Sequence, residues 1–228
     1  MFDVIVPLRS GSKGLKDKNI LQFGNQNLIN HLLNKIINIK DINKIFILTD
    51  SEKYKKKIKK NKKININYLR PKKLSLDNSK IYDLISHFLK WTNVKNHKMK
   101  NILLLQVTSP LLNKVEIEKT ISFIKRKKVN SLFHVCEMIE HPSECIKGLN
   151  KKWSFLAKNN KINRQNYEKY YFITGSLYFF TKNFFLKNKK FYIKNSYAYK
   201  VDKINFVDID TNFDFAISKA LKKFKIRN

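Results

Sequence analysis

The hydrophobic positions of this chain alternate between short apolar runs and helix-like repeats. Residues 2–8 (FDVIVPL), 44–50 (KIFILTD) and 101–107 (NILLLQV) are mostly apolar, which predicts buried strands. A lysine-rich stretch at 51–61 is interpreted as a solvated helix, and a short strand is expected around 66–69. Between the strands, apolar residues recur on one helix face, first as Leu28, Ile29, Leu32, Leu33, Ile36 and Ile37, and then as Ile81, Leu84, Ile85, Phe88 and Leu89.

This alternation predicts an α/β fold with a mostly parallel sheet that is covered by helices on both faces. Ligands of such sheets bind beyond the carboxyl ends of the strands. The residues that follow predicted strands are therefore the first candidates for a functional site. They are 9–19, Asp50, 106–110 and 208–210.

The regular alternation breaks between about Glu137 and Thr174, and it returns with the strand-like run SLYFF at 176–180. The irregular stretch contains EHPSE, a tryptophan and the polar run KNNKINRQNYEKYY. We interpret residues 1–228 as one domain with an inserted segment at about 137–175. An aromatic-rich excursion from an α/β core commonly forms a subunit contact or a lid, and we expect one of these roles here.

The formal charge of the chain is +31, because 48 lysine and arginine residues face only 17 acidic residues. Such a charge is typical of nucleic-acid-binding proteins. Here the lysines are spread along the whole chain together with asparagine and isoleucine, which favours a compositional bias at tolerant surface positions. We therefore expect no specific nucleic acid partner, although a basic nucleic-acid-binding protein is the alternative from another functional class. The charge would still attract anionic substrates.

Other features narrow the class further. Cys136 and Cys145 lack the spacing of a metal site and are too few for a disulfide framework. No apolar run approaches the ~18 residues of a membrane-spanning helix, and the first residues have no basic n-region or cleavage site. We expect a cytoplasmic protein with no membrane partner. His134 lies in an apolar stretch and is interpreted as a core residue.

The loop after the first predicted strand combines small and cationic residues. Its small residues are Ser10, Gly11, Ser12 and Gly14. They allow several backbone N–H groups to turn towards one point, an arrangement that suits phosphate oxygens. The cations that could neutralise a triphosphate are Arg9, Lys13 and Lys18. The spacing fits neither a P-loop nor G-x-G-x-x-G, and a solvated basic loop is the alternative.

Two further groups follow predicted strands. In FVDIDTNFDF, the side chains of Asp208 and Asp210 would share one face of a strand and could share a divalent cation. The alternative is a strand-end charge beside an acid near a helix N-terminus. In LLLQVTSPLL, Gln106, Thr108 and Ser109 offer uncharged groups suited to ligand hydroxyls or amides, or to the backbone of their own turn. No G-x-S-x-G motif supports hydrolysis through a serine nucleophile.

Three separated motifs, in this order, resemble the CMP-acylneuraminate (CMP-sialic acid) synthetases, or acylneuraminate cytidylyltransferases. PLRSGSKGLKDKN is similar to the family's P-A-R-x-G-S-K-G-L-x-x-K-N, LLLQVTSPLL to its L-L-Q-P-T-S-P-L-R, and VDIDTNFDF to its D-I-D-T-x-x-D-F. The segments YLRPKKLSLDNS, EMIEHPSE and RQNYEKYYFITGSLYF also fall where this family has similar segments. The resemblance covers nearly the whole chain.

The resemblance implies a three-layer, Rossmann-like α/β nucleotidyltransferase fold and a homodimer whose inserted segment reaches the neighbouring active site. The implied reaction transfers CMP from CTP to the anomeric hydroxyl of a nonulosonic (sialic-type) acid and releases pyrophosphate, with Mg²⁺ as the cofactor. The implied nucleotide-binding residues are Leu8, Arg9, Ser10, Gly11, Ser12, Lys13, Lys18, Asn19 and Arg70. The implied sugar-acid ligands are Gln106, Arg164 and Gln165. The implied metal ligands are Asp208 and Asp210, and the implied catalytic residues are Arg9, Lys13, Lys18 and Asp210.

The chain departs from the family pattern on the sugar side. Phe172 and Thr174 stand where members often carry R-x-N-G, and Glu144 follows the His-Pro pair where a basic residue is expected. The sugar acid therefore stays open among N-acetylneuraminate, legionaminate, pseudaminate and their relatives. The nearer alternative is a nucleotidyltransferase of the same fold for another sugar acid, such as an octulosonate.

Overall fold

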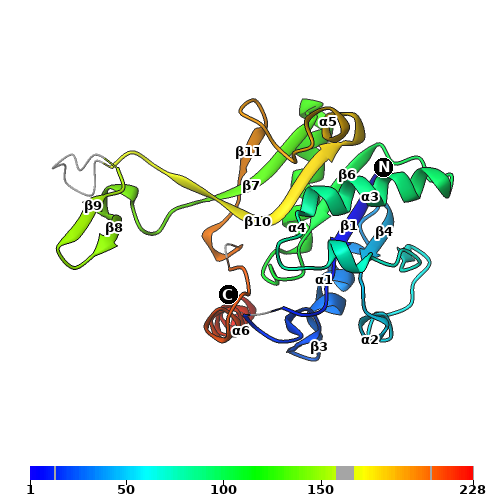
Figure 1. The fold of residues 1–228 in the computed structure, drawn as a ribbon, viewed down its shortest axis with the longest axis horizontal. Helices are drawn as coiled ribbons and strands as arrows, with labels where there is room; N and C mark the ends of the chain where they lie inside the picture. The colour runs from blue at the N-terminus through cyan, green and yellow to red at the C-terminus, as the bar shows by residue number, and fades with distance from the viewer. Residues whose placement is uncertain (13, 158–166, 206, 228) are drawn as a thin grey trace.

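The computed structural model describes residues 1–12, 14–157, 167–205 and 207–227, and its centre is a seven-stranded sheet in the order β11-β7-β10-β6-β1-β4-β5 (Figure 1). The strands are β1 (Phe2–Pro7), β4 (Ile42–Leu48), β5 (Ile64–Asn65), β6 (Asn101–Leu105), β7 (Ser131–Glu137), β10 (Tyr171–Thr181) and β11 (Tyr197–Lys200). Neighbouring strands are parallel except at β10, which is antiparallel to both β6 and β7. The predicted, mostly parallel sheet is confirmed.

Alternate residues of the strands face opposite layers of helices, as the period of two in a strand requires. In β1, Val4 and Val6 pack in the core formed with α1 (Leu28–Ile36) and α4 (Lys114–Lys127), whereas Ile5 packs in the core formed with α3 (Ile81–Val94). Helix α5 (Lys182–Asn188) joins the layer of α3, and α6 (Asn212–Arg227) adds partly buried residues to the layer of α1. These are the three layers that the resemblance implies.

Two sequence predictions in the lysine-rich region were wrong in extent. The helix expected across 51–61 is the single turn α2 (Glu52–Lys55). Only Tyr54 and Ile58 are buried in this stretch, so a longer helix would lack the apolar contacts that stabilise it. The strand expected around 66–69 is β5 instead, and Leu69 forms only an isolated bridge to Thr49.

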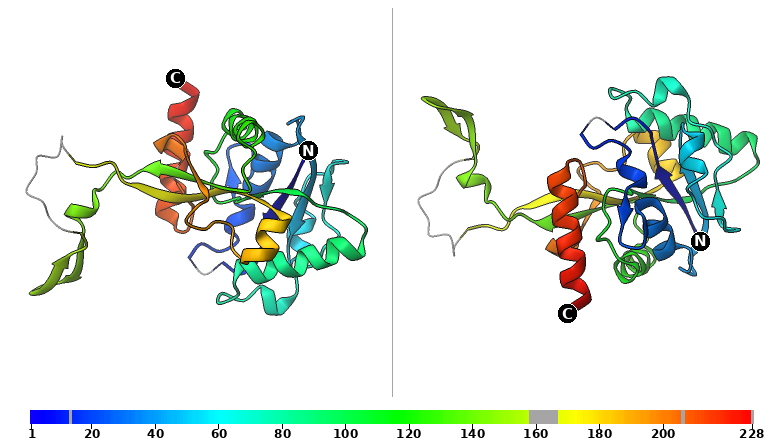
Figure 2. Two further views of the ribbon diagram at one scale, coloured as in Figure 1. Left: turned by 90° about the horizontal axis from the view of Figure 1, so that it is seen from above. Right: turned by 90° about the horizontal axis from the view of Figure 1, so that it is seen from below.

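Strands β7 and β10 continue beyond the sheet into an arm, which Figures 1 and 2 show standing well away from the helical layers. The arm carries the hairpin of β8 (Ile146–Leu149) and β9 (Lys152–Phe155), and all residues of both strands are exposed. Its exposed apolar side chains include Ile139, Ile146, Leu149, Trp153, Phe155 and Leu156. The role of this arm as an inserted dimerisation segment stays a prediction.

The remaining elements are short. A hairpin of β2 (Gln22–Phe23) and β3 (Gln26–Asn27) precedes α1, and the 3-10 turns are η1 (Lys18–Ile20), η2 (Lys72–Leu74), η3 (Pro142–Glu144) and η5 (Lys203–Asn205). Within the described part of the chain, we find no helix with the length and apolar character needed to cross a bilayer.

Candidate active site

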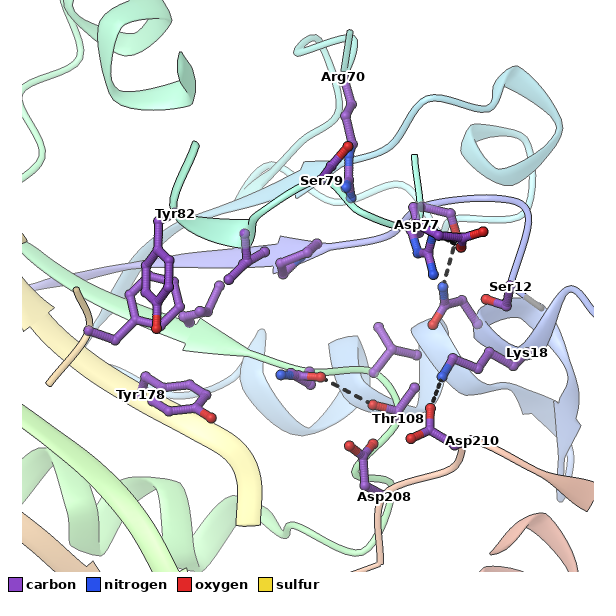
Figure 3. Close-up of a pocket in the computed structure, with 18 of the residues that line it drawn as sticks. Ser12, Lys18, Arg70, Asp77, Ser79, Tyr82, Thr108, Tyr178, Asp208 and Asp210 are labelled. Atoms are coloured by element: carbon purple, nitrogen blue, oxygen red, sulfur yellow. Dashed lines mark hydrogen bonds and ion pairs between the residues drawn. The ribbon is translucent and has the colours of Figure 1, made fainter. Parts of the chain in front are cut away.

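A cavity of about 380 Å³ lies at the carboxyl ends of β1 and β6 (Figure 3). The loop after β1 forms one wall, the segment from Arg70 to Tyr82 forms another, and the segment that carries Asp208 and Asp210 closes a third side. The sequence predicts a ligand site at these carboxyl ends of the strands. The predicted site residues that line the cavity are Arg9, Ser12, Lys18, Asn19, Arg70, Gln106, Asp208 and Asp210.

Three predicted nucleotide-binding residues do not line this cavity. Leu8 is fully buried in the core, and Gly11 and Ser10 lie beside the cavity in the same loop. The backbone N–H and the hydroxyl of Ser10 both donate to the carboxylate of Asp50, at 2.8 and 2.9 Å. The nucleotide-binding roles of Leu8, Ser10 and Gly11 stay predictions. The predicted residues outside the described parts of the chain are Lys13, Arg164 and Gln165.

The loop after β1 is fixed by contacts with segments that are distant in sequence. Asp50, two residues after β4, holds the first turn of the loop through Ser10. The buried Asn19 donates from Nδ2 to the carbonyl of Arg9 at 3.0 Å. A Cβ at Gly14 would lie 2.5 Å from the carbonyl oxygen of Asp210, so only glycine allows this close approach. The loop is thereby brought against the predicted metal-binding segment.

Two cations that line the cavity, Arg9 and Lys18, have carboxylate partners in the free protein. Lys18 Nζ lies 2.5 Å from Asp210 Oδ1 and donates to the carbonyl of Ile209 at 3.0 Å. Arg9 Nη1 lies 2.7 Å from Asp77 Oδ1, and both residues line the cavity. A triphosphate that enters here would therefore compete with carboxylates for both cations.

Arg70 lies deeper than the other cations and is 6% exposed. Its Nε and Nη2 groups both donate to the carbonyl of Leu74, at 2.8 and 2.5 Å. Burial lowers the pKa of Arg70, and the nearby Asp50 opposes this effect. Leu74 belongs to the 3-10 turn η2, so this turn fixes the Arg70 guanidinium beside Ser79, as Figure 3 shows.

Asp208 and Asp210 do not lie in a strand, contrary to the sequence prediction, although they alternate as residues of a strand would. Val207 and Ile209 are buried in the core, and the two carboxylates face the other way, towards the cavity. The N–H of Ile209 donates to the carbonyl of Thr108 at 2.9 Å and fixes this extended segment beside the turn after β6.

Two buried oxygens at the cavity have no hydrogen-bond partner among the described residues, namely Ser12 Oγ and Asp208 Oδ1. Burial raises the pKa of Asp208; a hydrogen bond with Thr108 lowers it, and the charge of Asp210 raises it further. Buried polar atoms are normally hydrogen-bonded, so a ligand in the cavity would satisfy both oxygens.

These residues fit a magnesium ion that a phosphate ligand helps to bind. Carboxylate oxygens are ligands that Mg²⁺ prefers, and the ion commonly uses one or two carboxylates together with phosphate oxygens. In the described ranges, no group of three or more histidine, cysteine or acidic side chains could hold a metal without such help. Asp208 Oδ1, unpartnered and buried, is the observation that favours a cation here.

The far end of the cavity is lined by aromatic residues that the sequence analysis missed. Tyr82 lies near the N-terminus of α3, Tyr178 belongs to β10, and Phe191 and Tyr192 follow α5. The rings of Tyr82 and Phe191 are 4.6 Å apart, and those of Tyr178 and Tyr192 stack at 6.1 Å. These aromatic residues come from three separate parts of the chain, and the sequence does not show that the fold brings them together. The aromatic enrichment of β10 is the one signal that could have indicated Tyr178.

The turn after β6, which carries Gln106 and Thr108, is held by α1. His31 Nε2 donates to the carbonyl of Pro110 at 3.1 Å, and Lys35 Nζ donates to the same carbonyl at 2.5 Å. Burial lowers the pKa of His31 to about 4, and the charge of Lys35 lowers it as well. The neutral imidazole therefore serves as a fixed donor that positions the turn.

Protonation of His31 is expected to destabilise the fold. The folded-state pKa lies below the ordinary value of 6.5, so the unfolded chain binds the proton first and stability falls as the pH drops from 6.5 towards about 4. The free energy of unfolding should fall by up to about 1.4 kcal/mol per pH unit for this residue. Urea unfolding at several pH values between 7.5 and 5 gives the free energy of unfolding as a function of pH. This free energy should fall less steeply with decreasing pH for His31→Gln than for the unmodified protein. An equal pH dependence in both proteins would contradict the assignment.

Comparisons with known proteins show what this chain is similar to. A family model described as cytidylyltransferase matches residues 4–224. An N-acylneuraminate cytidylyltransferase of Streptococcus agalactiae is 30% identical over 215 residues, which are 92% of this chain and 51% of that protein. A pseudaminic acid cytidylyltransferase of Campylobacter jejuni is 26% identical over 223 residues, covering 96% of this chain and 95% of that protein. The chain thus spans about half the length of the streptococcal relative.

A solved structure of CMP:2-keto-3-deoxy-manno-octonic acid synthetase complexed with CTP has the same fold. It matches with a TM-score of 0.71 and covers 98% of this chain and 99% of its own, at 12% sequence identity. Because the identity is so low, this likeness shows the fold alone.

Proposed function

This chain belongs to the cytidylyltransferase family, and we propose that it transfers CMP from CTP to the anomeric hydroxyl of a nonulosonic acid. The resemblance of the three motifs predicts this family. The names of the streptococcal and Campylobacter relatives support a sialic-type acid as the acceptor. In the proposed reaction the acceptor hydroxyl attacks the α-phosphorus of CTP, the bond to the β-phosphate breaks, and pyrophosphate leaves.

The observation that carries this proposal is a single cavity with two chemically different ends. One end contains Arg9, Lys18 and the unpartnered hydroxyl of Ser12, which suit a triphosphate. The other end, which we call the acceptor end, contains Gln106, Tyr178 and the other aromatic residues, which suit the hydroxyls and the apolar substituents of a sugar. The two carboxylates lie on the third side, beside Thr108 and Lys18.

Charge stabilisation is the main catalytic contribution that these residues can make. Negative charge builds up on phosphate oxygens as the new bond forms and pyrophosphate leaves. Arg9 and Lys18 would stabilise that charge, together with Lys13 of the same loop. To do so, Lys18 exchanges its contact with Asp210 for a phosphate oxygen, and Arg9 exchanges its contact with Asp77. Arg70 and Ser79 would lie at the cytidine side.

Asp208 and Asp210 would hold Mg²⁺ in the proposed complex. When bound, the ion supplies Lewis acidity that lowers the pKa of the attacking hydroxyl and offsets phosphate charge. The protein residues contribute binding and orientation. The turn after β6 fixes Asp208 through Ile209, and Gln106 orients the sugar acid.

We also propose that two chains form a homodimer through the arm. The enzyme would act in the cytoplasm, where CTP is available. Exposed apolar side chains such as Leu149 at 77% and Leu156 at 65% support a partner surface on the arm. Light scattering should give a particle mass twice that of the 27.2 kDa chain. A monomer at micromolar concentration would contradict this assembly.

Pyrophosphate release tests the proposed function directly. The protein is incubated with Mg²⁺, each of the four nucleoside triphosphates and a panel of nonulosonic and octulosonic acids. Release with CTP and a nonulosonic acid is the expected result, and release only with an octulosonic acid would instead establish the nearer alternative. Absence of release and of CTP-dependent thermal stabilisation would overturn the proposal and favour the nucleic-acid-binding class, for which RNA affinity should collapse with salt.

A further inference from the structure

A chain of buried polar side chains lies behind the acceptor end of the cavity, and the proposed reaction does not use it. It consists of Thr120 in α4, His134 in β7, and Thr174 and Ser176 in β10, each at most 3% exposed. Buried polar groups are costly in an apolar core unless they are hydrogen-bonded, and a fully satisfied network rigidifies its surroundings. Such a network is therefore a candidate for a positioning role.

The hydrogen bonds of this network link α4, β7 and β10. Thr120 donates its proton to the carbonyl of Glu116 at 2.8 Å, so its oxygen accepts from His134 Nε2, which lies 2.9 Å away. His134 Nδ1 then accepts from Ser176 Oγ at 3.3 Å. Thr174 Oγ1 donates to the carbonyl of His134 at 3.4 Å and lies 2.8 Å from Ser176 Oγ. Because Thr120 gives its proton to Glu116, this assignment places the proton of His134 on Nε2.

The imidazole stays neutral in this environment. Burial lowers the pKa of His134 to about 3, and the ring of Tyr199 stacks on it with centroids 5.5 Å apart. A neutral ring has one donor and one acceptor nitrogen, which is the pair of roles that Thr120 and Ser176 require.

The network lies at a large bulge of β10. The pairing of β10 with β7 shifts its register between Ile173 and Tyr178, where residues 174–177 of β10 face the single residue His134 of β7. Gly175, in this bulge, has a φ of +72°, a conformation that glycine adopts without strain. Bulges of this kind are common beside active sites, where they redirect the chain. The hydroxyls of Thr174 and Ser176 flank the glycine and tie both sides of the bulge to His134.

The bulge touches the residues that are predicted to bind the acceptor and the metal. The carbonyl of Ser176 accepts a hydrogen bond from the N–H of Gln106 at 3.3 Å. A Cβ built on Gly175 would lie 3.8 Å from both Gln106 Nε2 and Asp208 Oδ2, in ordinary van der Waals contact. A shift of the bulge would therefore move Gln106 directly and would open or close the space beside Asp208.

We propose that Thr174, Ser176 and His134 form a positioning network, which holds the Gly175 bulge against Gln106 and so sets the acceptor end of the site. The inference rests on the proposed function for its effect on the reaction. These residues touch no substrate in this scheme and act only through Gln106 and the bulge.

Two substitutions of Thr174 separate hydrogen bonding from packing. Thr174→Val keeps the shape and removes the hydroxyl, whereas Thr174→Ser keeps the hydroxyl and removes a methyl group. For the sugar acid that the unmodified enzyme turns over, we expect Thr174→Val to raise KM at least about tenfold with little change in KM for CTP. Thr174→Ser should stay within about twofold of the unmodified enzyme. Thr92→Val is the matched control, because Thr92 is also buried and its hydroxyl donates within α3, to the carbonyl of Leu89.

An unchanged acceptor KM in Thr174→Val, an equal rise in both KM values, or equal defects in the valine and serine variants would each overturn the network. Hydrogen exchange of the backbone N–H of Gln106, which donates to Ser176, gives a readout that does not depend on activity. Exchange should accelerate at least about tenfold in Thr174→Val and stay unchanged in Thr174→Ser and Thr92→Val. If the unmodified protein releases no pyrophosphate with any pair of substrates, the proposed function fails, and this exchange pattern alone decides whether the network holds the bulge.

Discussion

Asp210→Asn is expected to reduce CTP-dependent pyrophosphate release by roughly 10²–10³-fold while the protein stays folded. The substitution preserves the size of the side chain and removes the charge that is predicted to bind Mg²⁺ beside Asp208. The Asp210 side chain is 70% exposed, so the change should alter the free energy of unfolding by no more than about 0.5 kcal/mol. Initial rates at saturating CTP and Mg²⁺, together with thermal unfolding, measure both effects.

Asp83→Asn is the matched control for this experiment. Asp83 is an exposed acid in the first turn of α3, and it is not among the residues that line the cavity. The same change in net charge at this position should leave turnover within about twofold of the unmodified enzyme. Retention of full activity by Asp210→Asn would remove Asp210 from the metal site and from the catalytic residues.

Lys18→Ala is expected to lower kcat/KM for CTP by roughly 10²-fold. In the free protein, Lys18 lies on η1, contacts Asp210 and projects towards the phosphate end of the cavity. In the proposed reaction, its loss would remove a positive charge from the place where pyrophosphate leaves, and it would also release Asp210 from an ion pair. Steady-state kinetics with varied CTP and saturating sugar acid provide the measurement.

Lys57→Ala separates this local effect from the general field of a chain with a charge of +31. Lys57 is exposed beyond the end of α2, and its removal changes the net charge equally. We expect its kcat/KM for CTP to stay within about twofold of the unmodified value at 0.15 M salt, where distant surface charges are screened. If the two variants lose activity equally, the loop after β1 is only part of a diffuse basic surface.

The hydrophobic pattern predicted the sheet because β1, β4 and β6 are buried on both faces, and such strands are continuous apolar runs. The pattern failed at 51–61, where helix-compatible lysines lack an apolar face. It also assigned Asp208 and Asp210 to a strand, because alternation alone does not distinguish a sheet strand from an extended segment.

The partners of the predicted site residues were beyond the reach of the sequence. The loop motif indicated a phosphate site, but Ser10 is held by Asp50, 40 positions away, and Arg9 is held by Asp77, 68 positions away. Such pairings depend on which strand ends become neighbours in the sheet. His134 was correctly interpreted as a core residue. Its role as the link between α4 and β10 depends on the bulge of β10, which no local sequence pattern predicts.

The alternation at 207–210 makes this segment tolerant of some genetic changes and intolerant of others. Val207 and Ile209 anchor it in the core, and the two intervening carboxylates face the cavity. Exchange of valine for isoleucine at either anchor would preserve the arrangement. Insertion or deletion of one codon directly before this segment would turn both acids towards the core and both anchors towards the cavity. Natural variants of this chain should therefore differ here by substitution and never by a single-residue change in length.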